Sequence, residues 1–238
     1  MKQRQIWIVL LLIWSLAPMA WQVLTSFSTN DALVTVDVSF QHRWTLQNYR
    51  ELLQGTPPFW RYLLNSTIVA AESTLLTLLL ALPASYGLAR LPAIWRNTSR
   101  VVITAAALFP YVLLFLALLE LARTFHLGNN LLAIALPYSA LSMPLALLLL
   151  TAAFEGLPRD LEDAARLEGM TLMQRLRWVL IPLIAPATAS TGILVFLFAW
   201  NEYPIALTWL SDSHLLTLPV AMARIAGSSI YAVPYGAY

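Results

Sequence analysis

Five apolar stretches constrain the fold of this chain more than any other feature of its sequence. A helix needs about 20 apolar residues to cross the hydrocarbon core of a membrane, and its backbone groups must be paired within the helix. Stretches of this length cover residues 6–24, 63–89, 101–122, 131–154 and 183–207. We therefore expect an all-α, polytopic transmembrane helical bundle that forms a single domain over residues 1–238.

The composition supports the membrane class and argues against several kinds of catalysis. The chain is 59% hydrophobic and 11% charged, against about a quarter charged in soluble domains. It has no cysteine, its three histidines are scattered, and its one lysine, Lys2, lies outside any Gly-rich turn. Thiolate chemistry, a clustered metal site and a phosphate-binding loop are therefore disfavoured, and no basic patch indicates binding of nucleic acid. We expect a chain that is not an enzyme.

The first apolar stretch has a second interpretation, as a secretory signal peptide. Lys2 and Arg4 precede it, and Ala17 and Ala20 lie near its end. The stretch is longer than a usual signal core and lacks a clear small-x-small cleavage site. A membrane span is the favoured interpretation, with the signal peptide as the alternative.

Basic residues near the ends of the spans predict the orientation. With the N-terminus in the cytoplasm, nine basic residues lie inside: Lys2, Arg4, Arg90, Arg96, Arg100, Arg159, Arg166, Arg175 and Arg177. Five lie outside: Arg43, Arg50, Arg61, Arg123 and Arg224. This imbalance places residues 155–182 in the cytoplasm. In the external segment 27–62, the alternating stretch 33–38 predicts either a short strand or an extended loop.

The polar segment 155–182 predicts a short charged helix. Pro158 suits the first helical turn, where its missing N–H costs nothing. Two pairs of opposite charge at i,i+4 spacing, Arg159 with Asp163 and Glu162 with Arg166, support an exposed helix. The small residues Ala164 and Ala165 are expected on an exposed ridge that lets another protein come close.

Signals for a break and a second helix follow. Gly169 can adopt positive φ and end the first helix. Thr171 and Gln174 have the spacing of a capping box, and Pro182 marks entry into the fifth span. The alternative interpretation is an amphipathic loop that lies on the membrane surface.

This segment resembles the cytoplasmic loop of ABC-importer permeases. The family pattern is Glu-Ala-Ala, three residues, Gly, nine residues, Ile-x-Leu-Pro. The same spacing joins Asp163-Ala164-Ala165, Gly169 and Val179-Leu180-Ile181-Pro182. Asp replaces Glu, Val replaces Ile and Ile replaces Leu.

Other segments resemble the maltose-type, carbohydrate-importing branch of that family, so that the resemblance covers nearly the whole chain. They are Trp60-Arg61-Tyr62-Leu63-Leu64-Asn65-Ser66, Ser85-Tyr86-Gly87-Leu88-Ala89-Arg90, Asn201-Glu202-Tyr203, Leu207-Thr208-Trp209-Leu210-Ser211-Asp212 and Thr217-Leu218-Pro219-Val220.

The resemblance implies a type I importer permease in the bacterial cytoplasmic (inner) membrane. Its helix at 158–171 would couple the permease to a separate ATPase, through Glu162, Asp163, Ala164, Ala165, Arg166 and Gly169. The implied partners are two ATP-binding subunits, a second homologous permease and an external solute-binding protein, within membrane lipid. ATP and Mg would bind the partner subunits, with no cofactor in this chain.

Polar groups within or near the spans are candidates for the translocation pathway. Glu72 lies well inside the second span, where a hydrogen bond between helices is the alternative role. Glu202 lies near the outer end of the fifth span, where hydration at the interface is the alternative, as it is for Glu120. Asn201 and Tyr203 offer groups that sugars bind, or anchors at the interface.

Several alternatives remain open. Related permeases carry glycerol phosphate or other polyols. A secondary transporter would need coupling carboxylates in broken helices, where only Glu72 is deep enough, and a structural subunit without its own pathway is a further option. The family usually has one more span, and residues 218–238 make a poor one, so a truncated or incompletely covered chain is expected.

Overall fold

The computed structural model describes residues 2–28 and 44–227. Helices dominate these residues, and the one β feature among them is an isolated bridge between Ser28 and Trp44. The stretch 33–38, for which a strand or an extended loop is predicted, lies outside the described residues, as does 228–238. The chain divides into two compact units, one of residues 63–220 and one of residues 1–62 with 221–238, and the prediction of a single domain stays a prediction.

Long helices and short helical elements follow one another along the chain. They are α1 (Lys2–Ser26), α3 (Gln47–Gln54), α4 (Phe59–Ala89), α5 (Ala93–Ala107), η1 (Tyr111–Leu114), α6 (Phe115–Thr124), α7 (Leu131–Glu155), α8 (Arg159–Leu167), α9 (Leu172–Arg175), η2 (Leu176–Leu180, a π-helix), α10 (Ile181–Leu183), α11 (Ala185–Asn201), α12 (Pro204–Trp209), η3 (Ser213–Leu215) and α13 (Leu218–Gly227).

In the smaller unit, α1 presents an apolar surface to its surroundings. The segment Gln5–Ser26 is long and apolar enough to cross a membrane, and its large side chains are exposed, with Trp14 at 82%. Asn48 of α3 donates to the carbonyl oxygens of Ser26 and Ser28, at 2.9 and 3.0 Å. This amide fastens α3 to the end of α1.

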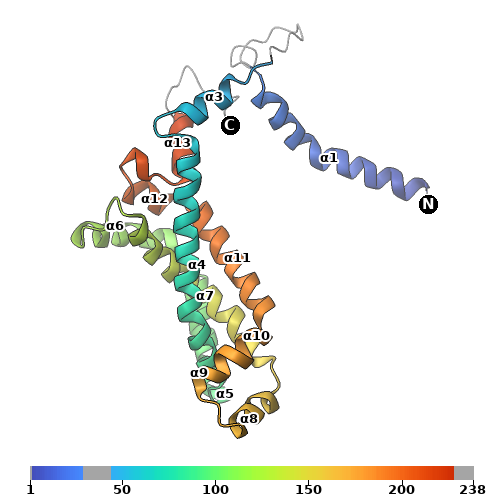
Figure 1. Ribbon diagram of the computed structural model, residues 1–238, viewed down its shortest axis with the longest axis vertical. Helices are drawn as coiled ribbons and strands as arrows, with labels where there is room; N and C mark the ends of the chain where they lie inside the picture. The colour runs from blue at the N-terminus through green and yellow to red at the C-terminus, as the bar shows by residue number, and fades with distance from the viewer. Residues whose placement is uncertain (1, 29–43, 228–238) are drawn as a thin grey trace. The chain divides into compact units, whose positions relative to one another are not determined.

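In the larger unit, α7 packs against both α5 and α11. Figure 1 shows α4, α7 and α11 running side by side, with α8 beyond their lower end. The core is made by α4, α7, η2 and α11, through the buried residues Ala81, Ala89, Ala146, Leu150, Phe154, Leu176, Leu180, Ile184 and Val195. Asn130 caps α7, accepting from the N–H groups of Leu132 and Ala133.

Two expected spans are bent rather than straight. The third is divided into α5 and the η1–α6 segment, which meet at 75°. Pro110 directly precedes the second piece as its N-cap residue. It separates the two pieces because it lacks an N–H and disfavours a helical conformation at the residue before it. The segment Leu172–Leu183 and α11 meet at 81°, next to Pro186. Helix α11 also ends at Asn201, short of the expected 207, because Pro204 begins a separate helix, α12.

By length and composition, the described residues contain three helices that could cross a membrane, or up to five if each bent pair is one span. The three are Gln5–Ser26, Phe59–Ala89 and Leu131–Glu155. Five matches the number expected from the apolar stretches.

Gly192 allows α11 to lie close to α4. A Cβ at Gly192 would meet Leu78 Cδ1 at 3.3 Å and Thr74 Cγ2 at 3.6 Å, whereas a Cβ at Gly87 of α4 meets nothing within 4 Å. Small residues at such crossings let helices in membranes approach each other. The two helical glycines therefore form a matched pair, one crowded and one open.

We expect Gly192→Val to destabilise the chain by about 1–3 kcal/mol relative to Gly87→Val, because overpacking forces α4 and α11 apart. Both variants carry the same β-branched penalty in a helix, so that this cost cancels. The measurement is the midpoint of unfolding of the purified protein in detergent. Equal midpoints for the two variants would contradict the close packing.

Candidate functional site

Helix α8 and the turn that follows it form the candidate site. The helix covers nine residues, with Pro158 at its N-cap and Asp160 and Glu162 in its first turn. Acidic groups are favourable there, because the N-terminus of a helix carries partial positive charge. The helix is followed by Gly169, whose φ is 79°. This left-handed conformation suits glycine, and Gly169 therefore ends the helix as predicted.

The second predicted helix begins as expected and then departs from regular geometry. The capping box is present, since Thr171 Oγ1 accepts from the Gln174 N–H and the Gln174 side chain accepts from the Thr171 N–H at 2.8 Å. Helix α9 then passes into the π-helix η2, in which the N–H of Ile181 donates to the carbonyl of Leu176. Such π turns often occur at functional sites.

The side chain of Glu162 points into the protein rather than along the surface of α8. Glu162 is 7% exposed. Its Oε2 accepts from Arg90 Nε at 2.8 Å, and its Oε1 accepts from the Tyr86 hydroxyl and from Arg175 Nη1 at 3.4 Å. The prediction of an ion pair between Glu162 and Arg166 is therefore wrong. Arg166 Nη1 instead lies 3.9 Å from Asp163 Oδ1.

These residues tie α8 to the ends of three other elements. Tyr86 lies in the last turn of α4, Arg90 directly follows the last residue of that helix, and Arg175 ends α9. Arg90 also donates to the carbonyl of Phe154 at 3.5 Å, and the Phe154 ring packs edge-on against the Tyr86 ring with centroids 5.8 Å apart. We call Tyr86, Arg90, Glu162 and Arg175 the Glu162 cluster.

The Glu162 cluster keeps its carboxylate ionised. Burial by itself raises the pKa of Glu162, but hydrogen bonds from Tyr86 and Arg90, with the charges of Arg90 and Arg175, hold the pKa below its usual value. The cluster thus contains one negative and two positive charges. Arg90 Nη2 and Arg175 Nε are buried without a hydrogen-bond partner among the described residues.

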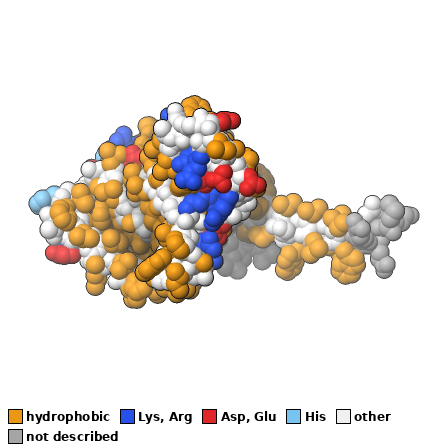
Figure 2. Space-filling model, turned by 90° about the horizontal axis from the view of Figure 1, so that it is seen from below, with side chains coloured by type: hydrophobic (Ala, Val, Ile, Leu, Met, Phe, Trp, Pro, Cys, Tyr) orange, Lys and Arg blue, Asp and Glu red, His pale blue; other side chains and the backbone are white. Residues whose placement is uncertain are grey.

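The opposite side of α8 is exposed. Asp163 and Arg166 have side chains that are 66% and 63% exposed, Leu167 is 90% exposed, and Ala164 is exposed. We call these four residues the outer face of α8. Ala165, expected beside Ala164 on an exposed ridge, is buried at 5%, because it lies three residues after Glu162 on the inward side of the helix. Viewed from this end, acidic and basic side chains gather in one patch among hydrophobic ones (Figure 2).

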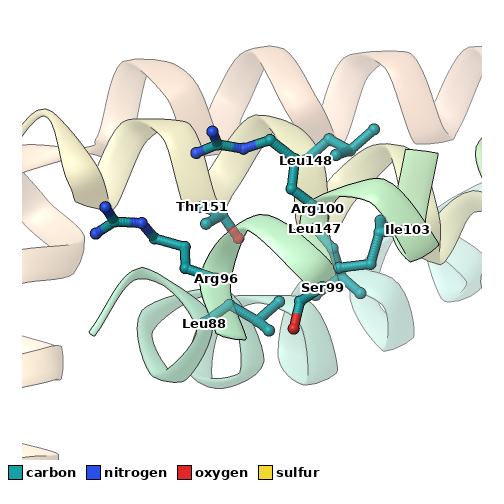
Figure 3. A pocket seen from close by; sticks show the side chains of 8 residues that line it. All are labelled: Leu88, Arg96, Ser99, Arg100, Ile103, Leu147, Leu148 and Thr151. Carbon is teal, nitrogen blue, oxygen red and sulfur yellow. The ribbon is translucent and has the colours of Figure 1, made fainter. Parts of the chain in front are cut away.

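A second charged cluster fastens α5 to α7. Glu155, the last residue of α7, lies 2.7 Å from Arg100 Nη2 and 3.4 Å from Arg96 Nε. Both arginines line a pocket of about 20 Å³, together with Thr151 (Figure 3). Ligand sites are typically about 300–1,000 Å³, so that we assign this cluster to helix packing.

The pathway candidates occupy different environments. Glu202 is 3% exposed; it accepts from the Tyr138 hydroxyl at 2.5 Å and from the N–H groups of Ile205 and Ala206 at 3.0 and 3.2 Å. It therefore joins α12 to α7, and the alternative of hydration at the interface does not fit its burial. Asn201 is exposed and donates to the carbonyl of its own helix at Leu197.

Tyr203 is 37% exposed, and Glu72 is partly buried, with an Oε2 that has no partner among the described residues. A cavity of about 720 Å³ lies among α5, η1, α7 and α11, and its lining includes Tyr111, Ser142 and Phe198. None of the four pathway candidates lines it. A role of these four residues in translocation stays a prediction.

No pattern in the sequence connects Tyr86, Arg90 or Arg175 with Glu162. Arg90 is 72 residues from Glu162 and Tyr86 is 76, so that no local spacing joins them. The signal in the sequence was limited to an arginine at the end of a span, facing a loop that contains carboxylates.

We expect Glu162→Gln to reduce stability at neutral pH and to have no such effect in acid. Glutamine is the neutral isostere of the protonated side chain. Because the folded-state pKa of Glu162 lies below the unfolded value of about 4.3, its stabilising contribution is fully present above that value and is lost as pH falls through the lowered pKa. Unfolding midpoints of both proteins in detergent should differ at about pH 7 and converge as pH falls through the lowered pKa of Glu162. A difference that does not change with pH would contradict this prediction.

Comparison with known proteins is consistent with this architecture. The chain matches the family model described as "Binding-protein-dependent transport system inner membrane component" over residues 73–235. A solved structure, a bacterial ABC transporter involved in the import of the acidic polysaccharide alginate, is similar with a TM-score of 0.78. That match is 21% identical and covers 99% of this chain and 88% of the other, and it supports the fold.

Curated relatives are more similar in sequence. The sulfoquinovosyl glycerol transport system permease protein SmoH of Agrobacterium fabrum is 38% identical over 226 residues, which cover 94% of this chain and 79% of SmoH. The trehalose/maltose transport system permease protein MalG of Thermococcus litoralis is 32% identical over 220 residues, 92% of this chain and 79% of MalG. The chain therefore belongs to the family of inner membrane components of binding-protein-dependent transport systems.

Proposed function

We propose that this chain is the permease subunit of an ATP-driven importer that moves a sugar or a sugar conjugate from an external binding protein into the cytoplasm. The observation that carries the proposal is the 38% identity to SmoH over 94% of the chain. Relatives named for trehalose/maltose and diacetylchitobiose transport support the same substrate class. A carbohydrate is the chemistry that these names share.

In this proposal, a separate ATP-binding subunit drives the permease by docking on the outer face of α8. Asp163 and Arg166 offer exposed charges, Ala164 allows a close approach, and Leu167 offers an apolar side chain. Gly169 shapes the end of the helix. These residues would dock on a separate ATP-binding subunit, which binds ATP and Mg. Glu162 and Ala165 would support that surface from the inside.

The remaining partners follow from the family. We propose two ATP-binding subunits, a second homologous permease that completes the pathway, and an external solute-binding protein. The proposed location is the bacterial inner membrane with the N-terminus in the cytoplasm, so that α8 lies on the cytoplasmic side and residues 203–217 lie outside. The excess of basic residues on the proposed inner side supports this orientation.

The test is reconstitution of the chain with its partner permease and ATP-binding subunits. We expect the subunits to co-purify, and ATP hydrolysis to rise when the external binding protein is added together with sulfoquinovosyl glycerol, trehalose, maltose or diacetylchitobiose. Gly169→Trp and Asp163→Lys should each lower that stimulation at least about tenfold, within the range of typical coupling between sites, while the chain still inserts into the membrane. Failure to co-purify, or normal stimulation of both variants, would contradict the proposal.

Because the chain lacks cysteine, its orientation can be tested with single cysteines. We expect Leu167→Cys, on the exposed side of α8, to react with a membrane-impermeant maleimide only in inside-out vesicles. Ser211→Cys, exposed after α12, should react only in right-side-out vesicles. Reaction of both cysteines from the same side would contradict the predicted topology.

A further inference from the structure

The inward carboxylate of α8 suggests how a movement of that helix reaches the membrane spans. We infer that Glu162 is a positioning residue that links α8 rigidly to the end of α4, so that displacement of α8 moves α4 through this side chain. The inference rests on the proposed function, in which a partner subunit displaces α8. It concerns the inside of the permease and not the surface on which the partner docks.

The backbone alone is a weak link between α8 and its neighbours. On one side, α8 joins α7 through Gly156, Leu157 and Pro158, and on the other it joins α9 through a turn that contains Gly169, whose φ is 79°. A Cβ at Gly169 would meet nothing within 4 Å. The N–H groups of Gly169 and Met170 donate to the carbonyls of Arg166 and Ala165, so that the hydrogen bonds of this turn close on α8 itself and do not join it to another helix. Each connection contains a glycine, which restricts the backbone less than other residues do. Rigid transmission therefore needs a contact between side chains.

The Glu162 cluster provides that contact through three donor side chains. Both oxygens of the carboxylate are used: Oε2 accepts from Arg90 Nε at 2.8 Å, and Oε1 accepts from the Tyr86 hydroxyl and from Arg175 Nη1. Tyr86 lies in the last turn of α4 and Arg90 directly follows its last residue, so that the end of α4 holds the carboxylate at two points. Hydrogen bonds to a charged group are stronger and more directional than neutral ones.

Charge makes the link depend on Glu162 in particular. Arg90 and Arg175 face the same carboxylate, and each has a buried nitrogen without a partner among the described residues. Removing the negative charge would leave two partly or fully buried guanidinium groups close together. Breaking a buried ion pair on one side is far more disruptive than removing an exposed one.

Asp163 provides a matched contrast. It is the next residue along α8 and carries the same charge, but its side chain is 66% exposed and its ion pair with Arg166 is 3.9 Å long. Asp163→Asn and Glu162→Gln therefore remove the same charge from adjacent positions, one on the outer face of α8 and one on the inner side. Tyr86→Phe removes one hydroxyl from the link and keeps the ring contact with Phe154.

The experiment measures the distance between α8 and α4 by pulsed electron resonance. Spin labels are attached to Asp160→Cys on α8, which is exposed and lies outside the outer face, and to Ala84→Cys on α4, which is also exposed. The assembled importer is used, with its partner subunits freed of cysteine, and also the full chain alone. In the assembly that keeps Glu162, we expect a narrow distance distribution. This distribution should be the same in the absence of nucleotide and after trapping with ATP and vanadate.

With Glu162→Gln, we expect a broad distribution that shifts on trapping, and stimulation of ATP hydrolysis reduced about tenfold although the ATP-binding subunit still co-purifies. Tyr86→Phe should broaden the distribution less, and it keeps the test valid if Glu162→Gln fails to fold. Asp163→Asn should keep the narrow distribution whatever its effect on docking.

An unchanged narrow distribution in both Glu162→Gln and Tyr86→Phe would overturn the inference. The inference would also be overturned if the distance between the labels shifted on trapping as much in the protein with Glu162 as in Glu162→Gln. A chain that assembles with no ATP-binding subunit would instead refute the proposed function. The width measured on the chain alone would still report on the link between α8 and α4.

Discussion

Polar groups inside hydrocarbon must find partners within the protein, and this constraint accounts for where the helices of the larger unit begin, bend and end. Helix α7 begins where the Asn130 side chain satisfies two N–H groups. The third span bends where Pro110 interrupts the helical ladder. Helix α12 begins where the Glu202 carboxylate accepts two N–H groups and a tyrosine hydroxyl. Each interruption is accompanied by a specific acceptor or by proline.

The parts of the fold that depend on local spacing could be predicted from the sequence. The apolar stretches located the spans, Gly169 ended α8, and Thr171 with Gln174 formed the capping box. The bends were also signalled, by Pro110 and Pro186, and the early end of α11 by Pro204. A count of apolar residues does not register a proline inside a stretch. In the site, the side of α8 that faces inward could not be predicted, because it depends on contacts with α4 more than 70 residues away.

Adjacent acidic residues of α8 have different environments, one inside the protein and one on its surface. Glu162 and Asp163 differ by one methylene group, yet one is held by three donors from other elements and the other lies in solvent. Because successive residues on a helix point about 100° apart, a short helix can be fastened on one side and remain open on the other. The polar character of the segment, taken from sequence alone as a surface property, is partly an internal one.

The π-helix between α9 and α10 has a consequence for the alignment of the core. Leu176, Leu180 and Ile184 recur every four residues, and all three are buried in the same cluster. In a regular helix, a step of four residues overshoots a full turn by about 40°, so that such a row would drift around the axis. The wider turn closed by the Ile181 N–H and the Leu176 carbonyl absorbs part of this drift. The one extra residue in this turn thus keeps Leu176, Leu180 and Ile184 facing the helices they pack against, up to the bend that leads into α11.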